Sequence, residues 1–146
     1  MFKSILVPTD GSELSQRAVK IAMELATLHQ ARVTAIHVIP DYHLLIAYEG
    51  AFDPVTEERI EEEAKTRAES YLAYVRKCAQ EVGVPCDTVC ETSDHPYDAI
   101  LKIAGTRRCD LIVMTSHGRK GLAAVLLGSE TRKVLTHTKI PVLIVR

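Results

Sequence analysis

The chain lacks the features that mark several kinds of protein. None of its apolar runs approaches the roughly 20 residues that a membrane span requires. The four cysteines form no C-x-x-C pair, and the six histidines have no ligand spacing, so we expect no metal held by side chains. The formal net charge is only −1, which gives no overall field that would attract nucleic acid or an anionic membrane. We therefore expect no nucleic-acid partner and no membrane partner.

Common signatures of catalysis are also missing. There is no Walker A pattern, no G-x-G-x-x-G, no G-x-S-x-G elbow and no H-E-x-x-H. Ser116 and His117 are a Ser–His pair, but adjacent residues do not readily hydrogen-bond in catalytic geometry. A loop imidazole that bonds to local backbone is the simpler reading of His117, with a phosphate contact as the alternative. We expect no catalytic residues.

What is present is an alternation of strand and helix patterns over residues 1–146, which predicts one doubly wound α/β domain. Strands are expected at 3–7, 32–39, 85–91, 111–114 and 141–145, and helices at 13–30, 54–82, 96–105 and 128–137. Ser12 or Asp10 is the expected cap of the first helix, Asp94 of the third, and Gly83 ends the second. The reduced cysteines and the short apolar start predict a cytoplasmic protein.

Residues 40–54 form one long irregular connection that contains Tyr42, His43, Tyr48 and Phe52. Long connections in compact domains are often functional, so this one is a candidate cover for a ligand. A surface flap without such contacts is the alternative, and the sequence leaves both open.

Two loops rich in small polar residues follow predicted strands, at 8–12 and 115–129. In open parallel sheets, ligands bind beyond the carboxyl ends of the strands. Asp10 offers a carboxylate to a ribose hydroxyl or an adenine amino group, and Gly118 permits close backbone approach to a phosphate. Gly128 and Ser129 offer N–H groups and a hydroxyl at a helix start, while Arg119 and Lys120 offer positive charge. Plain turn and cap chemistry would explain the same residues.

The chain resembles a universal stress protein of the UspA type. The resemblance rests on residues 5–12 (ILVPTDGS), 115–121 (TSHGRKG), 127–129 (LGS) and 140–145 (IPVLIV), in this order along the whole chain. It implies a Rossmann-like, five-stranded parallel sheet of order 3-2-1-4-5 with four helices, in which the two loops lie side by side. It also implies a homodimer that pairs through the last strand, Val142, Leu143, Ile144 and Val145.

ATP-binding members of that family show the pattern G-x2-G-x9-G-[S/T]. Here Gly118 and Gly128-Ser129 keep the spacing, but Thr115 stands at the first glycine. A β-branched residue is disfavoured there if the position needs a positive φ. It is harmless if the position is an ordinary extended residue at the end of the strand, and we favour this interpretation. The nucleotide-binding residues that the resemblance implies are Pro8, Thr9, Asp10, Val38, Met114, Thr115, Gly118, Arg119, Gly128, Ser129 and Glu130. The Glu130 backbone N–H would meet the phosphates, and its carboxylate would repel them.

The resemblance therefore predicts a stress-response module that binds an adenine nucleotide, ATP or AMP, with little or no turnover. Mg²⁺ would accompany the nucleotide if it is required at all. The alternative is a dimeric interaction or chaperone-like protein whose loop no longer binds a nucleotide, and Thr115 and Glu130 motivate it.

Overall fold

The computed structural model describes residues 1–42, 53–119 and 127–146. The strands are β1 (Ser4–Pro8), β2 (Arg32–Ile39), β3 (Cys86–Thr92), β4 (Leu111–Thr115) and β5 (Val142–Val145). The helices are α1 (Glu13–His29), α3 (Pro54–Val82), α4 (Pro96–Thr106) and α5 (Ser129–His137). All strand pairs are parallel, and the sheet has the order β3-β2-β1-β4-β5. The predicted architecture is confirmed.

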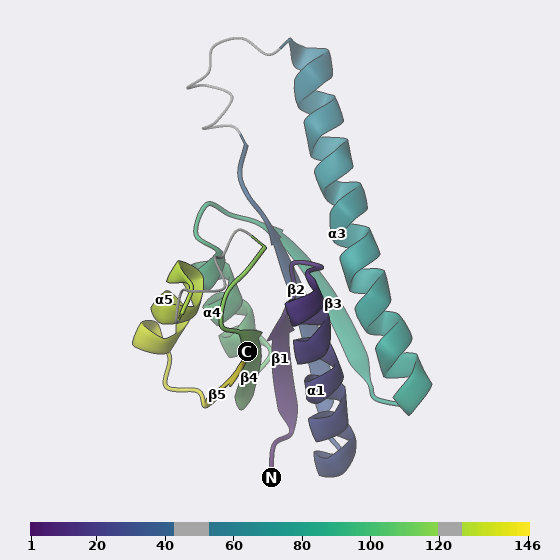
Figure 1. Ribbon diagram of the computed structural model, residues 1–146, viewed down its shortest axis with the longest axis vertical. Coiled ribbons are helices and arrows are strands. Elements are labelled where there is room, and N and C mark those ends of the chain that lie inside the picture. The colour runs from purple at the N-terminus through teal and green to yellow at the C-terminus, as the bar shows by residue number, and fades with distance from the viewer. Residues whose placement is uncertain (43–52, 120–126) are drawn as a thin grey trace.

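Helices cover both faces of the sheet, as the ribbon shows (Figure 1). Alternate residues of β1 serve opposite faces because successive strand side chains point to opposite sides. Ile5 and Val7 pack in a core cluster with α1 and α3, and Leu6 packs in a second cluster with α4 and α5. Since β1 lies at the centre of the sheet and all three side chains are fully buried, this short strand holds the two layers together.

Between β1 and β4 the strand order reverses, and the connections change from one face of the sheet to the other. Folds of this kind bind ligands at this position. From β1 the connections lead to β2 and β3 through α1 and α3, and from β4 the chain continues through α5 to β5 on the other side. The loops after β1 and β4 therefore start from adjacent strands and leave in opposite directions. This divergence opens a space at the carboxyl ends of both strands.

Local signals set most helix ends as expected. Ser12, and not Asp10, caps α1, because its side chain accepts from the backbone N–H of Ser15 at 3.2 Å. Gly83 ends α3 in the left-handed conformation, with φ +70. The predicted Asp94 cap is wrong: His95 occupies the cap position of α4 without a side-chain bond. No strand end differs from its predicted position by more than one residue.

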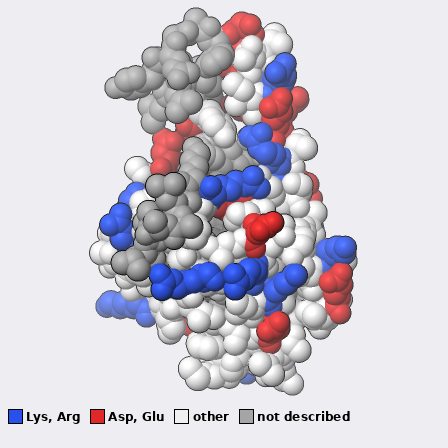
Figure 2. All heavy atoms as spheres, viewed as in Figure 1, with Lys and Arg blue, Asp and Glu red and all other residues white. Residues whose placement is uncertain are grey.

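Helix α3 extends past the carboxyl ends of the strands, and the first turns of its N-terminal half stand clear of the sheet (Figure 1). Ala64 and Ala68 on this half pack against Ile39 at the end of β2 and against Tyr42. Acidic and basic side chains are interspersed over it (Figure 2). Of the long connection singled out in the sequence, residues 43–52 lie outside the described residues, so whether it covers a ligand stays a prediction.

Candidate functional site

A cavity of about 710 Å³ lies at the carboxyl edge of the sheet. Its walls come from β2, from the loops after β1 and β4, from α3, and from the starts of α4 and α5. Ligand sites in proteins usually measure about 300–1,000 Å³, so the space suits a nucleotide-sized molecule. All the predicted site residues line it: Pro8, Thr9, Asp10, Val38, Met114, Thr115, Gly118, Arg119, Gly128, Ser129 and Glu130.

The loop after β1 is held rigidly by its own polar groups. The Thr9 backbone N–H donates to Ile36 O at 2.9 Å, and the Thr9 and Ser15 hydroxyls lie 3.2 Å apart. The Ser12 backbone N–H donates to Oδ1 of Asp10 at 3.0 Å. Gly11 turns the chain with φ +75, a conformation that other residues adopt at a cost. These bonds fix the direction of the Asp10 carboxylate.

Asp10 also joins this loop to the loop after β4. Its Oδ2 accepts from the Arg119 backbone N–H at 2.8 Å, and its carbonyl oxygen accepts from Arg119 Nε at 2.9 Å. Burial raises the pKa of Asp10, but the hydrogen bonds from Ser12 and Arg119 outweigh it and hold the pKa below its ordinary value of 3.8. The carboxylate is thus charged at neutral pH, with lone pairs left for a ligand hydroxyl or amino group.

Thr115 is an ordinary residue of a strand. It pairs with Val145 as the last residue of β4, and its φ is not positive. Its carbonyl oxygen accepts from the Thr131 hydroxyl at 2.9 Å, which fastens α5 to the strand. The backbone at this position therefore does not require glycine. This agrees with the interpretation that Thr115 is an extended residue at the end of the strand.

The two glycines of the pattern lie where a side chain would have little room. A Cβ at Gly118 would lie 3.1 Å from Oδ2 of Asp10, and a Cβ at Gly128 would lie 3.3 Å from Ser116 O. Neither glycine has a positive φ. The Gly128 backbone N–H donates to Ser116 O at 2.6 Å, so the start of α5 is pinned beneath the loop after β4.

The start of α5 carries no side-chain cap. Gly128 is its N-cap residue and has no side chain, whereas Ser12 caps α1 and Asp53 caps α3 through hydrogen bonds of their side chains. The first-turn residues Ser129, Glu130 and Thr131 line the cavity. Uncapped N–H groups at the positive end of a helix dipole are well suited to bind an anion such as a phosphate.

The Glu130 carboxylate has protein partners of its own, so the prediction that it faces phosphates needs correction. Oε2 accepts from the Tyr97 backbone N–H at 2.8 Å, and Oε1 accepts from Lys133 Nζ at 2.9 Å. The side chain therefore reaches from α5 to the first turn of α4. Its charge remains at the wall of the cavity, but its oxygen atoms are engaged on the α4 side.

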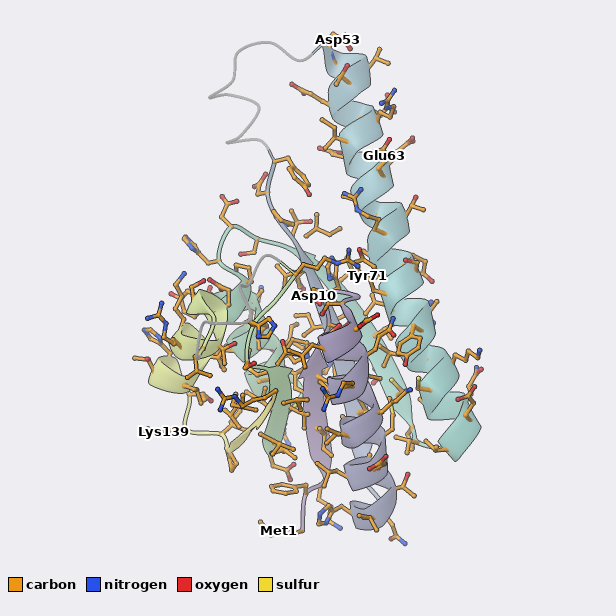
Figure 3. All side chains as sticks on the ribbon, viewed as in Figure 1. Met1, Asp10, Asp53, Glu63, Tyr71 and Lys139 are labelled. Atoms are coloured by element: carbon orange, nitrogen blue, oxygen red, sulfur yellow. The ribbon has the colours of Figure 1, made fainter. Side chains whose placement is uncertain are left out.

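The cavity residues that the sequence analysis missed include His37, Arg67 and Tyr71. His37 Nδ1 donates to Thr9 O at 2.7 Å, and its ring meets the Tyr71 ring edge-on with centroids 5.2 Å apart. Tyr71 also contacts Arg119, whose guanidinium lies 5.1 Å from the centroid of the Tyr71 ring. Figure 3 shows Tyr71 projecting from α3 near Asp10. The position of Tyr71 at the cavity follows from the packing of α3 against the sheet. The spacing of Tyr71 along the helix does not indicate a functional role.

Ser116 and His117 differ from expectation in one respect. The Ser116 hydroxyl lies 3.1 Å from Nδ1 of His117, so the adjacent side chains do hydrogen-bond. Ser116 is only 3% exposed, however, and His117 is the residue of the pair that lines the cavity. The bond is best explained as local support of the loop. Lys120, predicted beside Arg119, lies outside the described residues.

Other expectations concern groups away from the cavity. All four cysteines are unpaired. Over residues 1–42, 53–119 and 127–146, no cluster of three or more His, Cys, Asp or Glu side chains could hold a metal ion. Within the same ranges, no helix has the length and apolar character that crossing a bilayer requires.

Comparison with known proteins identifies the family of this chain. The sequence matches the Universal stress protein family over residues 1–146. The chain belongs to the universal stress protein family. A universal stress protein of Thermus aquaticus, encoded in the QAH/OAS sulfhydrylase 3′ region, is 34% identical over 149 residues and is matched over 100% of both chains.

Solved structures of the family share the architecture. The protein MJ0577 of Methanocaldococcus jannaschii superposes with a TM-score of 0.79 at 34% identity, over 99% of this chain and 96% of that one. UspA of Lactobacillus plantarum gives 0.80 at 27% identity, over 99% and 97%. More distant universal stress proteins have been solved with cAMP, at 24% identity, and, from Arabidopsis thaliana, with AMP, at 19%; they share the fold, with TM-scores of 0.70 and 0.68.

Proposed function

We propose that this universal stress protein binds an adenine nucleotide in the cavity between the loops after β1 and β4, with little or no turnover. The observation that carries the proposal is the joining of these loops through Asp10 and Arg119, beside a cavity that the uncapped start of α5 also lines. The cavity thus offers both a charged acceptor and backbone N–H groups. These match the ribose hydroxyls and the phosphate of a nucleotide.

The predicted residues divide by chemistry along the cavity. Pro8, Val38 and Met114 supply apolar surface for the adenine ring. The Asp10 carboxylate is the acceptor for a ribose hydroxyl, since carboxylate oxygens accept and cannot donate when charged. The Ser129 N–H and hydroxyl and the Glu130 N–H receive the phosphate, with Arg119 as the nearby cation, whereas the Gly128 N–H already donates to Ser116 O. Thr9 and Gly118 shape the loops, and Thr115 anchors α5.

Distant relatives of the same fold were solved with cAMP and AMP, which agrees with this assignment. ATP, with Mg²⁺ brought by the nucleotide, is the other candidate ligand. Little turnover is expected because the described cavity wall contains no nucleophile–base–orienter chain, and no group of three or more His, Cys, Asp or Glu side chains among the described residues could hold a metal ion.

We further propose a cytoplasmic homodimer that pairs through β5. β5 is an edge of the sheet, so one side of its backbone has no strand partner among the described residues. Leu143 on this strand is 39% exposed. An apolar edge strand needs cover to avoid uncontrolled pairing, and a second copy provides it. The unpaired thiols suit a reducing compartment.

Two measurements test nucleotide binding. Mass spectrometry of freshly purified protein should detect an adenine nucleotide, and titration calorimetry of stripped protein should give a saturable heat with ATP or AMP. Gly118→Ala combined with Ser129→Ala should abolish the heat, because the new methyl group crowds Asp10 and a phosphate ligand is lost. A clean preparation that gives no heat up to millimolar nucleotide, yet remains dimeric, would favour the interaction or chaperone-like alternative.

A further inference from the structure

Tyr71 of α3 lies where three parts of the cavity wall meet. Its ring packs edge-on against the His37 ring of β2, with the centroids 5.2 Å apart. It also fills the space beside Gly11 in the loop after β1, where a Cβ would collide with it. The Arg119 guanidinium, from the loop after β4, lies over the ring at 5.1 Å from its centroid. A single side chain of α3 therefore contacts β2 and both loops.

Arg119 is the residue whose freedom this contact restricts. It is exposed, and an unrestrained arginine on a loop would lose rotamer freedom when a ligand orders it. Two contacts hold it beforehand: Nε donates to Asp10 O at 2.9 Å, and the Tyr71 ring attracts the cation. The bond to Asp10 O uses one N–H group, so the N–H groups of the two terminal nitrogens stay available to a phosphate.

The Tyr71 ring is itself held in place. His37 Nδ1 donates to Thr9 O at 2.7 Å, which fixes the imidazole against which the ring packs. Gly11 has no side chain, so the loop after β1 passes close to the ring without displacing it. Leu72, the next residue of α3, is 3% exposed and belongs to the main core cluster. The support for Arg119 thus comes from the packed core and not only from the loop that carries it.

We propose that Tyr71 is a positioning residue, which holds the Arg119 guanidinium at the cavity wall for the phosphate of a bound nucleotide. The inference rests on the proposed nucleotide-binding function. Tyr71 acts on affinity through Arg119: with the ring in place, the cation is ordered before the ligand arrives, so less entropy is lost on binding. Without the ring, Arg119 keeps its charge but has to be ordered by the ligand.

A double-mutant cycle separates positioning from a general effect on the fold. Calorimetry of stripped protein, with AMP and with ATP, gives the dissociation constants of wild type, Tyr71→Leu, Arg119→Ala and the double variant. Tyr71→Leu should weaken binding about fivefold in the wild-type background, as the loss of a cation–π contact predicts. The same substitution should weaken binding less than about twofold once Arg119 is absent, because the two residues act as a unit.

Two further variants support the cycle. Tyr71→Phe keeps the ring, so it should restore most of the affinity that Tyr71→Leu loses. Tyr74→Leu is the matched control, because Tyr74 lies on the same helix, packs against the main core cluster and is not a lining residue of the cavity. It should leave the dissociation constant unchanged. Thermal melts establish that each variant is folded at the temperature of the titration.

The ordering of Arg119 is also observable without a ligand. Its Nε–Hε signal in a proton–nitrogen correlation spectrum is the one that Arg119→Ala removes. In the wild type this signal should be displaced by the ring current of Tyr71 and should exchange slowly with water, and Tyr71→Leu should return it to the position of a free arginine. A wild-type signal already at that position would contradict the proposal, whether or not the Tyr71 variants fold.

The outcomes separate the two proposals. If a nucleotide binds, and Tyr71→Leu either has no effect or weakens binding equally with and without Arg119, the positioning role is wrong while nucleotide binding stands. If neither AMP nor ATP binds to the wild type, both proposals are wrong. Loss of affinity that depends on Arg119, together with the displaced Nε–Hε signal, is the result expected.

Discussion

The backbone N–H of Arg119 donates to Oδ2 of Asp10 at 2.8 Å, although 109 positions separate the two residues. This bond closes the space between the loops after β1 and β4. The other carboxylate oxygen, Oδ1, accepts from the Ser12 backbone N–H at 3.0 Å. Asp10 therefore uses both carboxylate oxygens to hold the two loops together.

Asp10→Asn should weaken both the fold and nucleotide binding. An amide has one acceptor oxygen, so either Ser12 or Arg119 loses its partner and meets an NH₂ group instead. We expect a loss of about 1–2 kcal/mol in the free energy of unfolding, measured by urea titration. A wild-type-like stability would show that the loop–loop bond contributes nothing.

The stability difference between wild type and Asp10→Asn should depend on pH. The pKa of Asp10 is lower in the folded protein than its ordinary value of 3.8, so its contribution is fully present above that value. It is lost as the pH falls through the folded-state pKa, because the unfolded chain then binds the proton first. Urea titrations from pH 7 to pH 2.5 should show the difference shrinking below about pH 4. A difference that grows toward acid would contradict the assigned shift.

Gly11→Ala should destabilise the protein more than Gly83→Ala. Both glycines have a positive φ, +75 and +70, so each substitution costs about 1 kcal/mol or more for the left-handed conformation. A Cβ at Gly11 would also collide with the Tyr71 ring, whereas one at Gly83 meets no atom within 4 Å. We expect an additional loss of about 1–3 kcal/mol at Gly11, measured by urea unfolding. Equal losses would mean that Tyr71 moves aside freely.

Thr115→Gly restores the glycine of the ATP-binding pattern but should not improve nucleotide affinity. Thr115 already has ordinary strand geometry, so the substitution removes no strain. A glycine in a strand should instead cost about 1 kcal/mol of stability. Calorimetry with AMP and ATP, alongside thermal melts, tests both parts. A marked gain in ATP affinity would show that the threonine side chain obstructs the ligand.

Leu143→Lys should convert the proposed dimer to a monomer. A lysine on an edge strand opposes strand pairing between copies. Light scattering after size exclusion should then give 16.2 kDa in place of twice that mass. Leu28→Lys is the matched control, because Leu28 is 79% exposed at the far end of α1 and lies on no strand. Dissociation by the control, or a persistent dimer in Leu143→Lys, would place the interface elsewhere.

Cys86 should react slowly with thiol reagents while the protein is folded. Burial, with a smaller contribution from Asp87, raises the pKa of its thiol to about 11. At pH 8 only about one thiol in a thousand is then the reactive thiolate. Labelling with iodoacetamide, followed by peptide mass spectrometry, should show the rate rising steadily up to about pH 11 in the folded protein. If folded and urea-unfolded protein were labelled equally fast at pH 8, the raised pKa of Cys86 would be excluded.

Much of the fold could be read from local pattern. Ser12 and Gly83 act within one helical turn, so their roles at the ends of α1 and α3 follow from the neighbouring residues alone. The apolar runs predict the strands for the same reason. The cap of α4 could not be predicted in this way. The Tyr97 N–H donates to Glu130, which is 33 positions away, and no sequence pattern near residue 95 indicates this bond.

The sequence by itself determined the order of strands and helices, the family, and the residues that meet at the carboxyl edge of the sheet, because these depend on periodicity and on motifs with fixed spacing. Only the tertiary structure decided what those residues do to one another. The packing of α3 brings Tyr71 over Gly11 and under Arg119, and the packing of α4 against α5 turns the Glu130 carboxylate toward Tyr97. Such contacts join distant parts of the chain, and their geometry exists only after the layers have packed.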